Sequence, residues 1–215
     1  MKKKLALTVL IVLFCSTAMC GEELKPVTLP SPQTDKGVPL MQALKERKSM
    51  REFSSRELPL QMLSDLLWAA NGINRPASLG RTAPSAHDMQ EIDIYVAKAD
   101  GLYLYDAKAN ILQPVLKDDL RAMTGNQSFV KDAPINLVYV ADTAKMVGMA
   151  PSDMDFYMAS DTGFVSENVY LFCASAGLAT VVRGWIDKPR LAKAMKLRPD
   201  QRVVLAQTVG FPGGK

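Results

Sequence analysis

Apolar residues at helical spacing predict the main helices of the chain. Long helices are expected over 38–47, from Pro59 to Ala70, and over 156–176. The last is apolar around much of its circumference, so we expect it to be central or to lie in a subunit interface. Shorter helices are expected over 117–123 and just after Asp187. The helical pattern therefore covers both halves of the chain.

A second pattern predicts strands between these helices. Apolar and polar residues alternate over 92–97 and 102–105, and the run INLVYVAD at 135–142 is apolar enough for a buried strand. Further strands are expected from Thr180 and over 203–210. Hairpin-like strand pairs alternate with helices, so the pattern favours an α+β or mixed α/β class. Residues between 73 and 90 show no periodicity and predict a long loop, which in a compact domain is usually functional or disordered.

The N-terminus has the pattern of a secretory signal over residues 1–20. Three lysines at 2–4 precede an apolar run, 5–15, and then small residues. The alternative is a short N-terminal membrane anchor. Cleavage after Ala18 fits the small-residue rule, whereas Cys20 resembles a lipoprotein acceptor, so both processing routes stay open. We therefore expect an exported protein that is either periplasmic or held at the membrane by a lipid.

Removal of this signal changes the charge and the cysteine count. The signal carries three lysines and no acid, so 26 − 3 = 23 cations remain against 22 anions. A nearly neutral chain gives no argument for nucleic-acid binding. Cys173 is the one cysteine left, which excludes an intramolecular disulfide and, with His87 as the single histidine, a structural zinc site. Proline-rich residues 21–37 are expected to be an exposed linker before one domain, 38–215.

A basic cluster follows the first predicted helix, in the stretch RKSMREF. Arg47, Lys48 and Arg51 lie within five positions, with Ser49 among them. Arginine can bind two phosphate oxygens at once, and a hydroxyl adds a further ligand. A solvated basic turn would look the same. The cluster alone leaves both interpretations open.

Several other segments carry ligand-binding residue types, and each is also typical of an ordinary turn. Small residues and a proline at 81–91 would let backbone amides approach a planar ligand, and the two amides in GNQSF, 125–129, suit the edge of a heterocycle. The glycine in VVRGW, 181–185, allows close backbone approach. No Ser-His-Asp arrangement with a nucleophile elbow, no Walker A motif and no dinucleotide-binding glycine motif is present.

The order of these motifs resembles the nitroreductase family. RKSMREF is followed by a helix ending LLWAANG, then by RTAPSA, GLYLY, a long helix, GLAT, VRG and GFP. The likeness covers roughly residues 38–215 and is strongest to the branch that includes thiazole- and oxazole-forming oxidases. It implies an α+β fold with a mixed central sheet flanked by helices, and a long central helix in a homodimer interface.

The resemblance also implies that FMN binds at the dimer interface and supplies the chemistry. By this likeness, the phosphate and ribityl chain are held by Arg47, Lys48, Ser49 and Lys215, and the pyrimidine edge by Arg51. The ring face is flanked by Pro84, Ser85 and Ala86 of the other subunit, and Asn126 and Gln127 make polar contacts to the ring. Backbone groups of Val182, Arg183 and Gly184 pass near the reactive nitrogen of the ring.

Two features depart from the family pattern. His87 and Asp88 occupy positions where relatives often carry smaller residues, and Asp88 would place an anion near a flavin edge. Export would also separate the protein from cytoplasmic NAD(P)H. The expected function is an FMN-dependent oxidoreductase that reduces a nitro compound, quinone or similar small acceptor with NAD(P)H or another donor. The alternatives are a flavin-binding protein without turnover and a flavin-free interaction protein.

Overall fold

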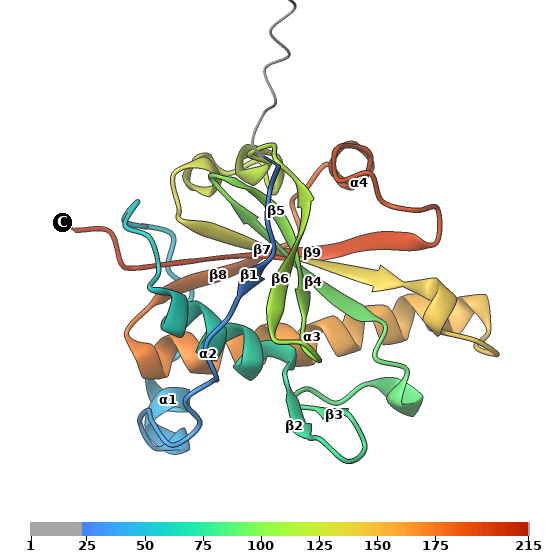
Figure 1. The fold of residues 1–215 in the computed structure, drawn as a ribbon, viewed down its shortest axis with the longest axis horizontal. Helices are drawn as coiled ribbons and strands as arrows, with labels where there is room; N and C mark the ends of the chain where they lie inside the picture. Colours follow the sequence, from blue (N-terminus) through green and yellow to red (C-terminus); the bar gives the residue numbers. More distant parts are fainter. Residues whose placement is uncertain (1–22, 215) are drawn as a thin grey trace, which may run out of the picture.

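The computed structural model describes residues 23–214, and seven strands within them form one sheet in the order β1-β6-β5-β4-β7-β9-β8 (Figure 1). A separate two-stranded hairpin, β2 with β3, projects from the helical side. The strands are β1 Val27–Thr28, β2 Ile73–Arg75, β3 Gly80–Arg81, β4 Ile92–Lys98, β5 Gly101–Asp106, β6 Ile111–Leu116, β7 Ile135–Asp142, β8 Ala179–Arg183 and β9 Gln201–Gly210. The helices are α1 Leu40–Glu46, α2 Leu60–Asn71, α3 Pro151–Ala176 and α4 Lys188–Ala194, with 3-10 turns η1 Ala86–Asp88, η2 Arg121–Met123, η3 Ser128–Lys131 and η4 Thr143–Lys145.

The sheet separates two apolar layers, because alternate residues of its central strands point to opposite faces. On β7, Leu137 and Tyr139 pack into the layer under α2 and α3, whereas Val138 and Val140 pack into the layer under α4. Every residue of β7 is buried. The apolar run at 135–142 is thereby confirmed as a buried strand at the centre of the sheet.

Helix α3 runs beneath the sheet for most of its width and is the longest helix of the described chain (Figure 1). Pro151 begins it, since a first-turn proline loses no helical hydrogen bond. Gly177 ends it with φ 67°, a left-handed conformation that glycine adopts without steric cost. The helix begins five residues before the expected Phe156, and its end is as expected.

The nitroreductase-like α+β fold is confirmed, with one difference in the sheet. A mixed sheet was expected, but each strand pairing among the described residues is antiparallel. The crossover β7-α3-β8 does create two parallel strands. They are not neighbours, because β9 lies between them and runs antiparallel to both.

The expected helix over 117–123 is wrong except for its last turn, η2. Asp119 Oδ1 accepts the backbone N–H of Arg121 at 3.0 Å and its carboxylate also holds the Arg121 guanidinium at 2.8 Å. Such a local bond competes with helical hydrogen bonds. Strand β6 was missed because Pro114 argues against a strand. The structure tolerates this proline because β1 pairs only with the first two residues of β6 and not with Pro114.

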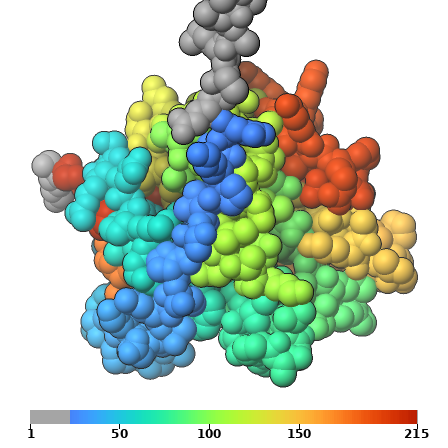
Figure 2. Space-filling view, in the orientation of Figure 1, coloured from blue at the N-terminus to red at the C-terminus, as the bar shows by residue number. Residues whose placement is uncertain are grey.

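The segment before α1 is not the exposed linker that its prolines suggested. Val27 and Thr28 form β1 against β6, and Leu29 is buried. The segment then crosses to the helices, where the N–H of Gln33 donates to Asp65 of α2 and the N–H of Val38 donates to Ser175 of α3. Figure 2 shows this blue segment lying along the surface between the cyan helical region and the green strands. The folded unit therefore begins before residue 38.

The expected signal over residues 1–20, including Cys20, lies outside the described residues, as does Lys215. Within residues 23–214, no helix has the length and apolar composition needed to cross a bilayer.

Candidate functional site

The basic cluster lies in an extended segment that follows α1 in the chain and contacts the start of β8. Helix α1 ends when the N–H of Arg47 bonds to the carbonyl of Ala43 at 2.8 Å. The N–H of Met50 then donates to the carbonyl of Thr180 on β8 at 2.9 Å. The cluster is therefore held by α1 just before Lys48 and Ser49, which are exposed, and by strand β8 just after them.

Tyr170 of α3 joins this cluster to β8. Its hydroxyl accepts the N–H of Val182 at 2.9 Å and lies 2.8 Å from the Ser49 hydroxyl, to which its own proton is free to donate. The Arg47 guanidinium carbon lies 5.2 Å from the centre of the Tyr170 ring. The structure thus brings together two of the segments that the sequence singled out, 47–51 and 182–184. It also corrects one detail, because the Val182 N–H is already engaged and is not available to a ligand.

The three cations of the cluster have no acidic partners. Within residues 23–214, Arg47, Lys48 and Arg51 form no ion pair with Asp or Glu. Lys48 and Tyr170 line an open pocket of about 480 Å³ together with Thr180 and Pro212. That volume is in the range of small-molecule sites. The cluster therefore brings cations without ion-pair partners in the described chain next to a cavity that Lys45, Lys48 and the acidic Glu46 line.

The C-terminal segment closes one side of this region. The N–H of Ser54 donates to Phe211, the N–H of Gly213 donates to Glu52, and Phe53 pairs with Pro212. Residues 211–213 therefore lie next to residues 52–54, just after the basic cluster.

Arg183, at the end of β8, points its side chain into the protein. Its guanidinium donates to the Thr124 carbonyl at 2.6 Å and to Asn136 Oδ1 at 2.9 Å, and it is 5% exposed. Burial lowers the pKa of Arg183 to about 10. Arg183 therefore holds the segment around Thr124 against β7 and β8. Gly184 is exposed just beyond the strand.

The segment of Asn126 and Gln127 lies beside this strand end. The N–H of Asn126 donates to the carbonyl of Trp185 at 3.2 Å. A side chain at Gly125 would collide with the Arg183 guanidinium. Gln127 Oε1 and Arg183 Nε are both buried and find no hydrogen-bond partner in the described chain. Buried polar atoms without partners are uncommon and indicate a missing ligand, water or strain.

The loop of Pro84, Ser85, Ala86 and Asp88 lies elsewhere along α3. The N–H of Ala86 donates to Asp161 Oδ2 at 2.8 Å. Asp161 precedes Tyr170 by nine residues, which is about 13 Å along a helix. Within one chain this loop therefore does not join the basic cluster, and its placement at the site by a second subunit stays a prediction. Asp88 Oδ1 accepts from the Gln90 side chain at 3.0 Å.

Two residues that organise these segments were missed in the sequence. Tyr170 and Asp161 lie in the longest predicted helix, where most apolar residues were taken as core, and both are buried. The available signal was the presence of polar side chains on the buried face of that helix. Their partners are far away in the sequence, so the pattern alone could not name them.

The comparisons with known proteins agree with this arrangement. The Nitroreductase family pattern matches residues 44–211. A Methanocaldococcus jannaschii protein provisionally named a nitroreductase is 30% identical over 75% of this chain and 86% of its own. A crystal structure of a protein provisionally named a nitroreductase, from Ralstonia eutropha, superimposes with a TM-score of 0.87 at 46% identity and covers 91% of this chain and 93% of that one.

A more distant likeness concerns the fold alone. The NADPH:FMN oxidoreductase of Vibrio harveyi, in complex with NAD⁺, gives a TM-score of 0.60 at 18% identity over 81% of this chain and 69% of that one. Members of the matched family typically bind flavin, and many are homodimers with flavin at the interface. With the family pattern covering most of the described residues and a structural relative over 91% of the chain, this protein belongs to the nitroreductase family.

Proposed function

We propose that this protein is an FMN-dependent oxidoreductase that works as a homodimer and reduces a small acceptor such as a nitro compound or a quinone. The observation that carries the proposal is the set of cations at 47–51, which have no acidic partners within residues 23–214 and lie beside a pocket. A phosphate monoester carries nearly two negative charges at neutral pH, so it would compensate this cluster.

The residues present fit FMN in two further ways. Ser49 adds a hydroxyl ligand whose position is held by Tyr170. Gln127 Oε1 and Arg183 Nε are buried and lack partners within the described chain, as expected where a polar ligand is to be bound. Arg47, Lys48 and Ser49 would hold the phosphate end, with Arg51 toward the pyrimidine edge. Asn126, Gln127 and the exposed Gly184 would meet the ring.

Bound FMN would supply hydride and electron transfer, and the chain would supply position and electrostatics. Arg47 and Lys48 would anchor the charged end of the cofactor, and the bond from Met50 to β8 would hold their segment in place. The unpaired cations also attract anionic groups to the pocket. Because the cofactor carries the reactive atoms, this scheme requires no nucleophile or general base from the protein.

A homodimer is supported by apolar side chains that one chain leaves in solvent. Helix α1 exposes Leu40, Met41 and Leu44, and α3 exposes Phe156 and Phe164. Clusters of exposed large apolar residues are typical of protein–protein interfaces. A second subunit would also bring a loop 84–88 to the site, which the chain by itself does not. Pro84, Ser85 and Ala86 would then flank the ring from the partner.

We further propose that the protein is exported, on the pattern of residues 1–20, and that it is periplasmic or lipid-anchored through Cys20. Its relation to the thiazole- and oxazole-forming branch stays a prediction from the motif order. Mass spectrometry of the protein purified from membranes and from the soluble fraction tests the location. A mature N-terminus at Cys20 carrying a lipid supports anchoring, and an intact residue 1 on protein from the soluble fraction contradicts export.

The visible spectrum of the purified protein tests the central proposal. Bound FMN absorbs near about 450 nm, which is a property of the cofactor itself. Colourless protein that also fails to take up added FMN would contradict the proposal and favour a flavin-free interaction protein. Anaerobic mixing with NADH or NADPH, followed by a nitro compound or quinone, tests turnover. If neither a donor nor a dithionite-reduced mediator supports repeated reduction and reoxidation of the bound FMN, the protein would be a flavin-binding protein without turnover.

A further inference from the structure

The residue that follows the 84–90 loop, Glu91, is a buried carboxyl without a hydrogen-bond partner. Its side chain is 1% exposed, and neither carboxyl oxygen is bonded to any group in residues 23–214. Its backbone is fixed, because the N–H of Asp142 donates to the Glu91 carbonyl at 2.9 Å. An ionised carboxylate is strongly disfavoured in such a place, and a proton removes the penalty.

A second buried acid, Asp161 of α3, binds the loop and lines a small cavity together with Gln90 and Ile92, the two chain neighbours of Glu91. Asp161 is 3% exposed, and its Oδ2 accepts the Ala86 N–H at 2.8 Å while Oδ1 receives the Ser160 hydroxyl at 3.3 Å. Burial is the main cause that raises the pKa of Glu91 to about 7; a backbone hydrogen bond lowers this pKa, Asp161 raises it and Lys145 lowers it. Two adjacent acids share one proton more readily than they carry two charges.

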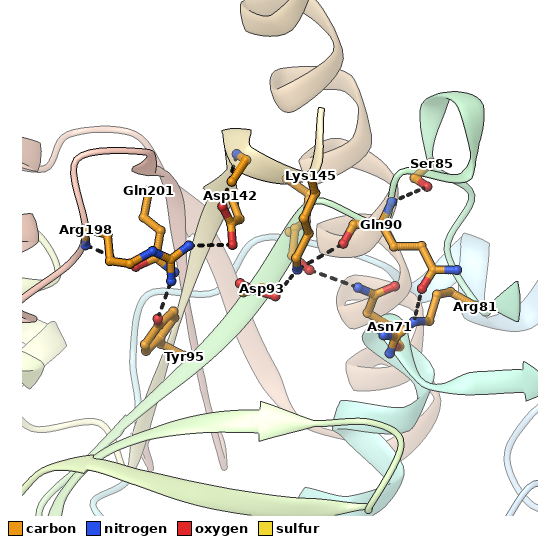
Figure 3. Close-up of polar contacts among 12 residues, drawn as sticks. Asn71, Arg81, Ser85, Gln90, Asp93, Tyr95, Asp142, Lys145, Arg198 and Gln201 are labelled. Carbon is orange, nitrogen blue, oxygen red and sulfur yellow. Dashed lines mark hydrogen bonds and ion pairs between the residues drawn. The ribbon is translucent and has the colours of Figure 1, made fainter. Parts of the chain in front are cut away.

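The loop between these acids has a backbone that needs to be held. His87, Asp88 and Gln90 all have positive φ, at 52°, 54° and 50°. Such conformations are unfavourable for residues other than glycine and persist only when surrounding contacts impose them. Figure 3 shows Gln90 bonded to Ser85 and to Arg81, which are the ties on the solvent side. The Asp161 bond to Ala86 is the tie on the buried side.

We propose that Glu91 and Asp161 form a one-proton latch that holds the 84–90 loop against α3. With a proton on Glu91, that carboxyl is neutral and the Ala86 N–H keeps its bond to Asp161. When that proton leaves to solvent, two like charges share a buried space. The repulsion is relieved by displacement of Glu91 and of the loop that leads into it.

The charged groups around Glu91 do not remove this repulsion. None forms an ion pair with Glu91 within residues 23–214, and most are engaged elsewhere. Lys145 of η4 pairs with Asp93 of β4 at 2.7 Å, and Asp142 of β7 pairs with Arg198 at 2.8 Å. Arg81 of β3 bonds to Gln90 and Asn71, and Asp88 of η1 bonds to Gln90.

The consequence for flavin depends on the proposed function. Pro84, Ser85 and Ala86 are the residues expected to flank the ring from the partner subunit. An open latch would therefore loosen one side of the flavin site as pH rises through neutrality. The latch itself is a property of the chain and is testable whether or not flavin binds.

Hydrogen–deuterium exchange of the full mature protein, with its cofactor as purified, tests the latch. We expect the protection of a peptide spanning 84–90 to fall at least about fivefold between pH 6 and 8.5, after correction for the intrinsic pH dependence of exchange. Glu91→Gln, which is neutral at every pH, should abolish this dependence. Glu167→Gln, an exposed change on the same helix as Asp161, should leave it intact.

A second variant tests the coupling of the two acids. Asp161→Asn keeps an acceptor for Ala86 but removes the charge beside Glu91, so the transition should move to lower pH. A transition that stays in place, or one that persists in Glu91→Gln, overturns the latch. If the variants fail to fold by circular dichroism, carboxyl NMR of the wild type decides: a carboxyl titrating near pH 7 supports the latch, and none above pH 6 overturns it.

The absorbance near about 450 nm, recorded on the same samples, separates the two proposals. A pH-dependent loop in protein that binds no FMN would leave the latch standing and overturn the proposed function. Bound FMN with a loop that does not respond to pH would do the reverse.

Discussion

At the scale of single residues, the basic cluster is the feature on which the proposed FMN site depends. Arg47, Lys48 and Arg51 are close in the sequence and lack acidic partners in the described part of the fold. Surface cations without partners are common, but here Tyr170 bonds to Ser49 of the cluster and to β8, and it also lines a pocket. The position of these cations beside a pocket therefore supports a binding site more strongly than their number does.

Arg47→Ala should weaken FMN binding by about 10- to 100-fold, because a charge-assisted hydrogen bond contributes about 1.5–3 kcal/mol. Fluorescence titration of the apoprotein with FMN measures the change. Lys193→Ala on α4, a distant exposed cation, is the matched control and should leave binding within about twofold. Equal binding by Arg47→Ala and wild type would contradict the phosphate assignment.

Tyr170→Phe should lower the free energy of unfolding by about 1–3 kcal/mol, since it leaves the Val182 N–H without its acceptor. Urea denaturation measures the change. Tyr157→Phe is the control on the same helix, because the Tyr157 hydroxyl has no hydrogen bond within residues 23–214. Similar small effects of both changes would show that the Tyr170 hydroxyl contributes little.

At the scale of elements, the fold relies on short segments that hold longer ones together. The segment 23–38 is an example, since it passes from β6 to α2 and α3 and contributes Leu29 to the core. Arg183 is another, because one buried guanidinium fixes the turn at Thr124 to β7.

Leu29→Ala should cost about 2–4 kcal/mol of stability, as expected when a buried leucine is truncated. Thermal or urea unfolding of the mature protein measures it. Leu60→Ala, at an exposed position of α2, is the control and should cost well under half as much. If the two changes cost the same, the segment before α1 would behave as a loosely held linker after all.

At the scale of the whole molecule, two features concern assembly of the chain with a second copy. One chain leaves Phe156 and Phe164 of α3 and the apolar face of α1 in solvent. It also places the 84–88 loop about 13 Å along α3 from the residue that holds Ser49. A second copy of the chain would account for both observations.

Phe164→Glu should therefore dissociate the proposed homodimer, because it places a charge in an apolar interface. Size-exclusion chromatography with light scattering measures the mass over a concentration series. Val147→Glu, at an exposed apolar position outside α1 and α3, is the control and should not change the mass. A wild-type protein that is monomeric at all concentrations would contradict the proposal directly.

Stability should fall as pH rises toward neutrality because of Glu91. Its folded pKa of about 7 lies above the ordinary 4.5, so the folded state binds more protons between these values. The stabilisation is fully present below pH 4.5, decreases above it and is lost by about pH 7. Glu91→Gln should remove about 1–3 kcal/mol of this pH dependence.

Unfolding free energies at several pH values between 5 and 8.5 measure this effect as the difference between variant and wild type. Glu167→Gln, which changes an exposed glutamate, should retain the wild-type dependence. Parallel pH curves for wild type and Glu91→Gln would contradict the raised pKa.

Much of the fold was predictable because its signals are local. The buried strand at 135–142, the long helix ending at Gly177 and the helix ending at Asn71 follow from periodicity and stop signals, which act within a few residues. β6 was not predictable, because Pro114 argues against a strand and is tolerated only because β1 pairs with Ile111 and Leu112 and not with the proline. The segment before α1 was not predictable either, since its partners lie elsewhere in the chain.

The sequence by itself determined the element pattern, the position of the basic cluster and the order of motifs that marks the family. Only the tertiary structure decided what each polar side chain faces. It turned Arg183 inward, placed Tyr170 between Ser49 and Val182, and buried Glu91 beside Asp161. The reason is physical: propensity and periodicity act between near neighbours, whereas burial and hydrogen-bond partners depend on contacts between residues many tens of positions apart.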